Sequence, residues 1–271
     1  MHERELEVGL DAARRACRHL MTEYERFQVV PDAPANITTE ADRQSQEIIL
    51  QAIRQAFPHD ALCAEEATAT LQASAHTGER LWIVDPIDGT RGFARKNGEF
   101  SVMVAFVDQG RIGVGVVLEP TWGRLTCAVR GGGCWRHDGD EEAVRCRVSA
   151  VSTLAEATLT QSRPSDPARK SRVVAALGPK DVLQTYSAGI KLALVARSEA
   201  DVYANTYDAF HDWDICAGHL LVEEAGGTVT GLGGETLHYG LPGAWQKSGL
   251  LATNGRLHEE ALKRLAVMRV E

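Results

Sequence analysis

Trp82-Ile83-Val84-Asp85-Pro86-Ile87-Asp88-Gly89-Thr90 is the most informative stretch of this 271-residue chain. The apolar residues 81–84 predict a short buried strand, and the chain is expected to break at Asp85-Pro86. A second carboxylate follows at Asp88, and Gly89 allows the backbone to approach a ligand closely. Carboxylate oxygens at a strand end suit Mg²⁺ and phosphate, and the carbonyl oxygen of Ile87 could join them. By residue type alone, an ordinary turn explains the stretch equally well.

The composition is that of a globular protein with a large core. Apolar residues make up 44% and charged residues 24%, in a length that suits one large domain or two smaller ones. The net charge of −8, without a basic stripe, argues against a nucleic-acid polymer as partner. The six cysteines form no C-x-x-C pair, which predicts reduced thiols. A charged amino terminus and the lack of a long apolar run predict a cytoplasmic protein that does not enter a membrane.

The hydrophobic pattern changes near residue 150. Helical spacing of apolar residues predicts two helices in the first half, over 4–27 and 42–57. Apolar runs predict strands over 62–64, 100–107, 112–118 and 124–129, and the charged stretch 136–147 is expected to be an irregular surface excursion. Strands and helices alternate after it, which favours an α/β half. We therefore expect a boundary between residues 1–150 and 151–271.

Three other segments place carboxylates at the ends of predicted elements. Thr39-Glu40-Ala41-Asp42 opens the second helix with the pattern of a capping box. Glu65-Glu66 ends a strand-like segment, as Asp85 ends the next one, so these two strand ends could converge on one site. Asp212-Trp213-Asp214 precedes a predicted helix, where Asp212 is the expected N-cap and Asp214 stays free to bind a metal.

The spacing of the candidate residues argues against several other kinds of catalytic or binding site. Phosphatases with a covalent aspartate use Asp-x-Asp, whereas Asp85 and Asp88 are separated by two residues, so an aspartyl-phosphate is not expected. The glycine fingerprints of nucleotide-binding loops are absent, and His211 and His219 do not have the spacing of a helical zinc pair. Lys191 lies where the chain turns into a helix, and is either a surface lysine or a phosphate contact.

Taken together, these segments resemble the inositol monophosphatase superfamily of metal-dependent phosphomonoesterases. That family combines Thr-x-x-Asp, Glu-Glu, Asp-Pro-x-Asp-Gly-Thr and a distal Trp-Asp whose helix runs to Glu-Ala-Gly-Gly. All four motifs occur here in the family's order, at 39–42, 65–66, 85–90 and 213–227. The resemblance implies an α+β fold, a layered αβαβα sandwich. Residues 1–150 would then carry most metal ligands, and residues 151–271 would carry Asp214 and substrate contacts.

The resemblance also implies roles for individual residues. The cofactor would be two or three Mg²⁺ ions, or Mn²⁺, because all-oxygen ligands without His or Cys select these ions over zinc. Such ions would also turn an acidic pocket into an anion site. The catalytic group would comprise Glu65, which helps one metal activate a water, and Thr90 paired with Asp42, which deprotonates it. The implied metal ligands are Glu65, Asp85, the Ile87 carbonyl, Asp88 and Asp214, and the implied substrate contacts are Gly89, Thr90, Lys191 and Asp214.

The expected substrate is a small phosphorylated metabolite. Residues 96–100 (Lys-Asn-Gly-Glu-Phe) and 187–191 resemble 3'(2'),5'-bisphosphate nucleotidases, in which Lys191 would meet the second phosphate of 3'-phosphoadenosine 5'-phosphate. Residues 223–227 fit inositol or histidinol phosphatases equally well, and a non-catalytic metal or nucleotide sensor is the third alternative. Pro31 stands where many members carry a lysine, which leaves the number of metal ions open. Whether two copies form a homodimer is also open.

Overall fold

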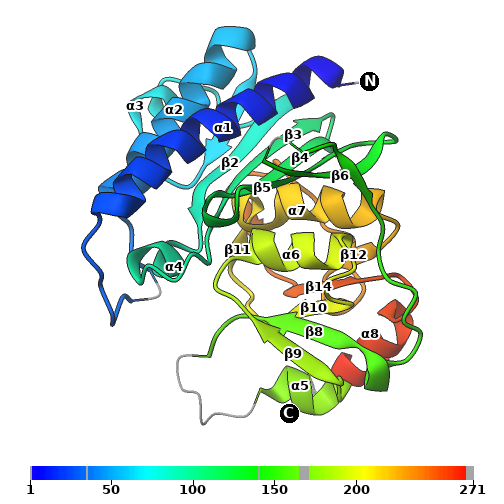
Figure 1. Cartoon of the computed structure of the whole chain (residues 1–271). Helices are drawn as coiled ribbons and strands as arrows, with labels where there is room; N and C mark the ends of the chain where they lie inside the picture. Colours follow the sequence, from blue (N-terminus) through cyan, green and yellow to red (C-terminus); the bar gives the residue numbers. More distant parts are fainter. Residues whose placement is uncertain (1, 35, 140, 165–170, 267–271) are drawn as a thin grey trace.

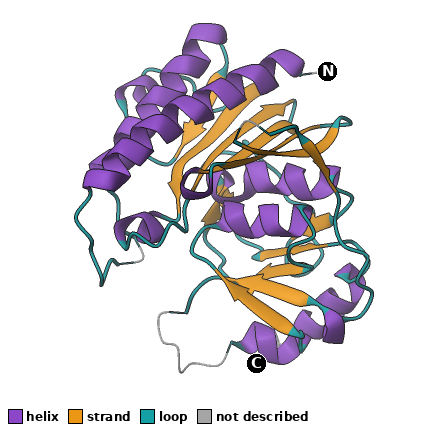
Figure 2. Cartoon of the chain, viewed as in Figure 1, coloured by secondary structure: helices purple, strands orange, loops and turns teal. Residues whose placement is uncertain are grey.

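The computed structural model describes residues 2–34, 36–139, 141–164 and 171–266, which form five stacked layers (Figure 1). Helices α1 (Glu3–Arg26) and α2 (Glu40–Ala56) cover the outer face of the first sheet. Helices α6 (Ala188–Ala196) and α7 (Asp212–Glu224) lie between the two sheets, and α5 (Arg172–Leu177) and α8 (His258–Ala266) lie beyond the second. Helix and strand layers therefore alternate, which confirms the expected αβαβα sandwich (Figure 2).

The first sheet has seven strands in the order of the sequence. Strands β1 and β2 are parallel, and every later neighbour is antiparallel. The strands are β1 (Ala61–Ala64), β2 (Arg80–Asp88), β3 (Ser101–Asp108), β4 (Arg111–Glu119), β5 (Arg124–Val129), β6 (Gly133–Asp138) and β7 (Val144–Cys146). Short helical segments connect them, namely α3 (Ala69–Gln72), α4 (Thr90–Ala94) and the 3-10 turn η1 (Pro120–Trp122).

The second sheet has five strands in the order β12-β14-β10-β8-β9, with β10, β8 and β9 parallel. Its strands are β8 (Thr158–Gln161), β9 (Asp181–Gln184), β10 (Val202–Asn205), β12 (Thr228–Thr230) and β14 (Leu250–Thr253), preceded by the 3-10 turn η2 (Leu154–Glu156). A separate pair joins β11 (Phe210–His211) to β13 (Trp245–Gln246) just before α7. No described helix is both long and apolar enough to cross a membrane.

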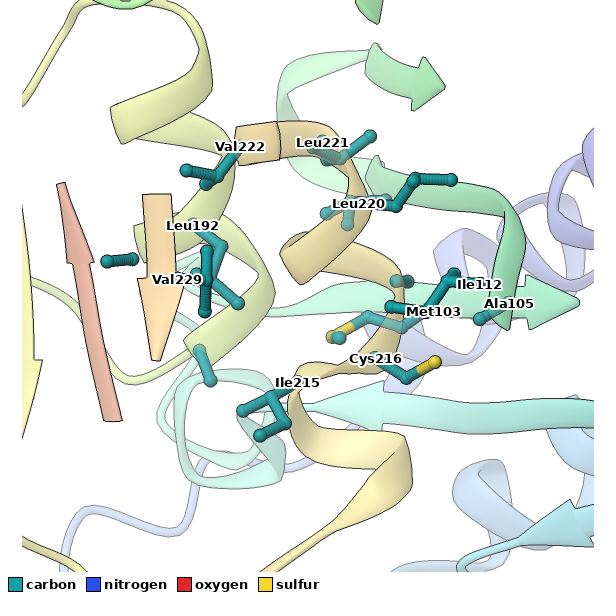
Figure 3. Close-up of a cluster of buried hydrophobic side chains, with 14 of the residues drawn as sticks. Met103, Ala105, Ile112, Leu192, Ile215, Cys216, Leu220, Leu221, Val222 and Val229 are labelled. Carbon is teal, nitrogen blue, oxygen red and sulfur yellow. The ribbon is translucent and has the colours of Figure 1, made fainter. Parts of the chain in front are cut away.

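One apolar core joins the two halves of the chain (Figure 3). Met103 and Ile112 of the first sheet belong to the same buried cluster as Leu192 of α6 and Leu220 of α7. Both central helices have buried residues around most of their circumference, as expected for helices between two sheets. The expected change of architecture falls between the sheets, in the segment after β7, while the division into two domains stays a prediction.

The structure corrects three expectations from the sequence. Strand β2 does not end at Asp85-Pro86 but runs to Asp88, because β3 continues to pair with it after a shift of register between Asp85 and Asp88. The stretch 136–147 was expected to be irregular, but residues 136–138 belong to β6 and residues 144–146 to β7, which extend the sheet there as its edge. The residue before α7 that acts as N-cap is His211 rather than Asp212, which is buried and accepts hydrogen bonds from Gly240 N and Gln246 Nε2.

Candidate active site

Four elements place the predicted carboxylates at one junction of the fold. Glu65 follows β1, Asp85 and Asp88 lie in the last part of β2, and Asp214 lies in the first turn of α7. Parallel pairing of β1 with β2 brings Ala64 opposite Val84, so the residues that follow these positions lie at the same end of the two strands. Asp42, in the first turn of α2, also acts electrostatically on Glu65 and Asp85. The structure therefore brings these five predicted residues together.

Asp42 and Thr90 form the predicted pair. The Thr90 hydroxyl lies 2.9 Å from Asp42 Oδ1 and 3.0 Å from the Ile87 carbonyl oxygen, so its single proton can be donated to either acceptor. Asp42 Oδ2 accepts hydrogen bonds from the backbone N–H and the hydroxyl of Thr39, at 2.8 and 2.6 Å. The capping box is thus present as predicted, and it fixes one oxygen of Asp42 while the other faces Thr90. Burial raises the pKa of Asp42.

Asp88 connects β2 to the start of α6. Its Oδ1 accepts a hydrogen bond from Ala188 N at 3.1 Å, and its Oδ2 accepts one from Gly189 N at 2.6 Å. The hydroxyls of Ser187 and Ser101 also donate to Oδ2. These donors fix the Asp88 carboxylate at the N-terminal end of α6, where the helix dipole favours negative charge. One side chain therefore ties the first sheet to the central helix layer.

The remaining carboxylates lack comparable partners. Burial, together with the charges of Glu65 and Asp88, raises the pKa of Asp85 well above its ordinary value. Loss of hydration and the charges of Asp214 and Asp42 raise the pKa of Glu65 to about 8. Burial raises the pKa of Asp214 to about 7, and Asp88 adds to the shift. In the described part of the chain, no lysine or arginine forms an ion pair with any of the three.

This donor set fits hard divalent cations. The clustered side chains offer only carboxylate oxygens, which are the ligands preferred by Mg²⁺ and Mn²⁺. Their mutual repulsion, visible in the raised pKa values, is the state that a bound cation would relieve. Among the described residues, no three His, Cys, Asp or Glu side chains already stand close enough to enclose an ion. Binding would therefore require the side chains to draw together.

Gly89 is required at the junction of β2 and α4. Its φ of 90° lies in the left-handed region, and a Cβ there would lie 2.7 Å from the Glu99 carbonyl oxygen and 3.2 Å from Ser187 N. Gly89 is also the N-cap of α4, and Thr90 is its first residue. Only glycine allows β2 and α4 to approach the 187–189 segment this closely, so Gly89 positions Thr90 beside Asp42.

The structure does not support the predicted phosphate contact of Lys191. Its side chain is only 1% exposed, and Nζ donates hydrogen bonds to the carbonyl oxygens of Thr185 and Tyr186 at 3.1 and 3.0 Å. The ammonium also lies 5.3 Å from the centre of the Tyr203 ring. Burial lowers the pKa of Lys191 to about 8. Lys191 therefore holds the backbone that leads into α6 and does not face solvent.

Two features next to the site were not predicted. Arg91 of α4 and Arg95, the C-cap of α4, both face the Tyr186 ring, with guanidinium carbons 5.3 and 5.8 Å from its centre. Their spacing of four residues was the available signal in the sequence, because it places two side chains on one face of a helix. A cavity of about 950 Å³ lies at the carboxyl ends of the parallel strands β8 and β9, lined among others by Gln161, Gln184 and Lys247. None of the predicted carboxylates lines that cavity.

A family model described as the inositol monophosphatase family matches residues 1–269. The chain belongs to this family. It is 31% identical over 270 residues to a histidinol-phosphatase of Mycobacterium tuberculosis, covering 98% of this chain and 99% of that one. It is 30% identical over 268 residues to a fructose-1,6-bisphosphatase/inositol-1-monophosphatase of Thermotoga maritima, covering 95% and 94%. As a member of the family, the protein is a phosphomonoester hydrolase.

The fold agrees with solved structures of the family. CysQ from Bacteroides thetaiotaomicron, described as a bacterial member of the inositol monophosphatase family, superposes with a TM-score of 0.75 at 26% identity. The alignment covers 93% of this chain and 98% of CysQ. The layered arrangement around the carboxylate junction is therefore the family's arrangement.

Proposed function

We propose that the protein is a Mg²⁺-dependent nucleotidase that converts 3'-phosphoadenosine 5'-phosphate to AMP and phosphate. The observation that carries the catalytic part is the Thr90 hydroxyl held 2.9 Å from Asp42 Oδ1, beside a cluster of carboxylates that form no ion pair with any described lysine or arginine. The nucleotide is favoured by residues 96–100 and by the arginines that surround Tyr186, since a bisphosphate carries a second anionic group.

The proposed metal ligands, Thr90 and Asp42 have separate roles in the reaction. Glu65, Asp85, Asp88, Asp214 and the Ile87 carbonyl would hold two or three Mg²⁺ ions, with Mn²⁺ as an alternative. When bound, these ions acidify a water and offset the charge of the leaving alkoxide. Thr90 orients the water and accepts its proton while its own proton is donated to Asp42. The water oxygen forms the new bond to phosphorus as the bond to the ribose 3'-oxygen breaks. That oxygen takes up a proton from a second water molecule, and Asp42 returns its proton to solvent.

Two elements of the chain would bind the substrate. The backbone N–H groups of Gly89 and Thr90 open α4, where a phosphate oxygen can accept hydrogen bonds. Asp214, at the start of α7, would contact the rest of the substrate as well as a metal ion. Asp88 keeps the first turn of α6 against this site through its bonds to Ala188 N and Gly189 N.

A panel of substrates tests this proposal. Release of phosphate is measured from 3'-phosphoadenosine 5'-phosphate, inositol 1-phosphate, histidinol phosphate and fructose 1,6-bisphosphate, with Mg²⁺, with Mn²⁺ and with excess chelator. We expect kcat/KM for the nucleotide to exceed the others by at least about tenfold, and chelator to stop the reaction. A nucleotide cleaved no faster than inositol 1-phosphate or histidinol phosphate would assign the protein to that alternative. A lack of turnover on every compound would instead support a sensor.

A further inference from the structure

Three guanidinium groups gather around one tyrosine at the edge of the candidate active site. The guanidinium carbons of Arg91, Arg95 and Arg163 lie 5.3, 5.8 and 5.9 Å from the centre of the Tyr186 ring. Arg95 Nη1 also donates a hydrogen bond to the Tyr186 hydroxyl at 2.8 Å. The arginines come from α4 with its C-cap and from the segment after β8, so the fold gathers them from two separate parts of the chain. We call these four residues the arginine cluster.

The positive charge of the arginine cluster is only partly balanced. Glu99 accepts hydrogen bonds from Arg163 Nε at 3.0 and 2.7 Å, and it is the one carboxylate of the described residues that forms an ion pair with a member of the cluster. The Nε of Arg91 donates to the Ala33 carbonyl oxygen, whereas the buried Nε of Arg95 has no hydrogen-bond partner among the described residues. Like charges this close repel one another, and an anion would relieve that repulsion.

The arginine cluster is reachable from solvent. Arg163 is exposed, and Arg91, Arg95 and Tyr186 are half-buried. A ligand can therefore reach the guanidinium groups, while the tyrosine ring and the backbone restrict their orientation. Guanidinium groups suit phosphate because two parallel N–H donors match two phosphate oxygens.

The cluster is directly connected to the catalytic residues. Arg91 follows Thr90 in α4 and Arg95 is the C-cap of the same helix, so the segment that presents the catalytic hydroxyl also presents two of the arginines. Tyr186 precedes Ser187, whose hydroxyl donates to Asp88, and Lys191 holds the Tyr186 carbonyl from inside the fold. The arginine side chains and the carboxylates thus occupy two adjacent parts of the same junction.

We propose that Arg91, Arg95 and Arg163, arranged around Tyr186, bind a second phosphate of the substrate that is not hydrolysed. This inference rests on the proposed phosphomonoesterase activity and assigns the second phosphate to these residues in place of Lys191. It predicts that the protein selects phosphate esters that carry two phosphate groups on one scaffold, with the scissile ester at the carboxylates and the other phosphate at the arginine cluster.

The decisive experiment compares two substrates that differ only in the second phosphate, namely 3'-phosphoadenosine 5'-phosphate and adenosine 3'-monophosphate. We expect R95Q and R163Q each to lower kcat/KM for the bisphosphate by about tenfold or more, through KM, because each loses a charge-assisted contact to phosphate. Hydrolysis of the monophosphate should change by less than about twofold. The control is R15Q, which removes an equal charge from an exposed position on α1, and it should alter neither substrate.

Melting temperatures of all variants show whether an effect comes from unfolding, and R163Q, with an exposed side chain, serves if R95Q is unstable. Equal losses on both substrates in a folded variant would overturn the proposal. If the wild-type protein hydrolyses neither nucleotide, the proposed nucleotide substrate is wrong, and the subsite is then judged by calorimetric titration with adenosine 5'-monophosphate. Weaker binding to R91Q/R95Q than to wild type supports the subsite, whereas equal binding, or no binding to wild type, overturns it.

Discussion

The carboxylate group and the arginine cluster lie next to each other but differ in burial. Asp42 and Asp85 are 1% and 2% exposed, they repel neighbouring carboxylates, and no described lysine or arginine pairs with either of them. The arginines are half-buried or exposed, and they surround an aromatic ring that tolerates positive charge on its face. The carboxylate group needs a cation small enough to enter the protein, whereas the arginine cluster can bind an anion directly from solvent.

The residues between the two groups explain why both belong to one site. Of the four proposed acidic ligands, Asp88 is the one for which the described residues supply donors to both oxygens. Ala188 N donates to Oδ1, and Gly189 N and the hydroxyls of Ser101 and Ser187 donate to Oδ2. Its charge is thereby stabilised by the helix layer, while Asp85 and Glu65 remain repelled. The difference teaches that one proposed ligand, Asp88, is held in place by hydrogen bonds before any ion binds, whereas the charges of Asp85 and Glu65 are left for a cation to balance. Replacing Asp88 by asparagine should therefore lower the stability of the metal-free protein, whereas the same change at Asp85 should not.

The largest effect is expected for Asp85→Asn. This change removes a proposed metal ligand, so we expect phosphate release to fall by roughly 10³-fold. It also removes a buried charge that neighbouring carboxylates repel, so the metal-free protein should melt at the same temperature as wild type or higher. Asp138→Asn is the control, because Asp138 is a carboxylate paired with Arg124 and Arg136 at the edge of the first sheet and should not affect activity. Activity retained by D85N would remove Asp85 from the metal site.

A smaller loss is expected when the Thr90 hydroxyl is removed. Thr90→Val keeps the shape of the side chain but loses the group held 2.9 Å from Asp42 Oδ1, and kcat should fall by about 10²- to 10⁴-fold. Thr90→Ser keeps a hydroxyl and should retain most of the activity. The Mg²⁺ concentration that gives half-maximal rate should be unchanged in both variants, because Thr90 is not a proposed ligand. A T90V enzyme as fast as T90S would show that the hydroxyl takes no part in the reaction.

Local sequence patterns predicted the helices that have one buried face and the strands that are apolar and buried along most of their length. Helices α1 and α2 and strands β3 to β5 were found in this way. Strand β9 was not expected, because all four of its residues are exposed and carry no alternation. The Asp42–Thr90 pair came from the family resemblance, since residues 48 positions apart give no local signal of contact. The partners of a side chain depend on the whole fold, which is why Lys191 was assigned to substrate and is buried instead.

Lys191→Met should give the smallest of these effects. It tests whether Lys191 supports the backbone before α6 or contacts a phosphate of the substrate. Its ammonium satisfies the carbonyl oxygens of Thr185 and Tyr186, so the substitution should destabilise the protein at pH 7 by about 1–3 kcal/mol. Lys180→Met, at an exposed lysine, is the matched control and should be neutral. Unfolding in urea measures both. Unchanged stability combined with a raised KM for the bisphosphate alone would instead restore Lys191 as a phosphate contact.

The pH dependence of the stability difference between the wild-type protein and K191M provides an independent check. Burial lowers the pKa of Lys191 from 10.5 to about 8, so between these values the unfolded chain binds a proton that the folded protein has released. The stability of the wild-type protein should therefore rise relative to K191M as the pH increases from 8 towards 10.5. A neutral amine still donates to both carbonyl oxygens, so the hydrogen bonds remain while the penalty for burying the charge disappears. A stability difference that stays flat across this range would mean that Lys191 releases no proton there, and that nearby carboxylates such as Asp88 hold it charged.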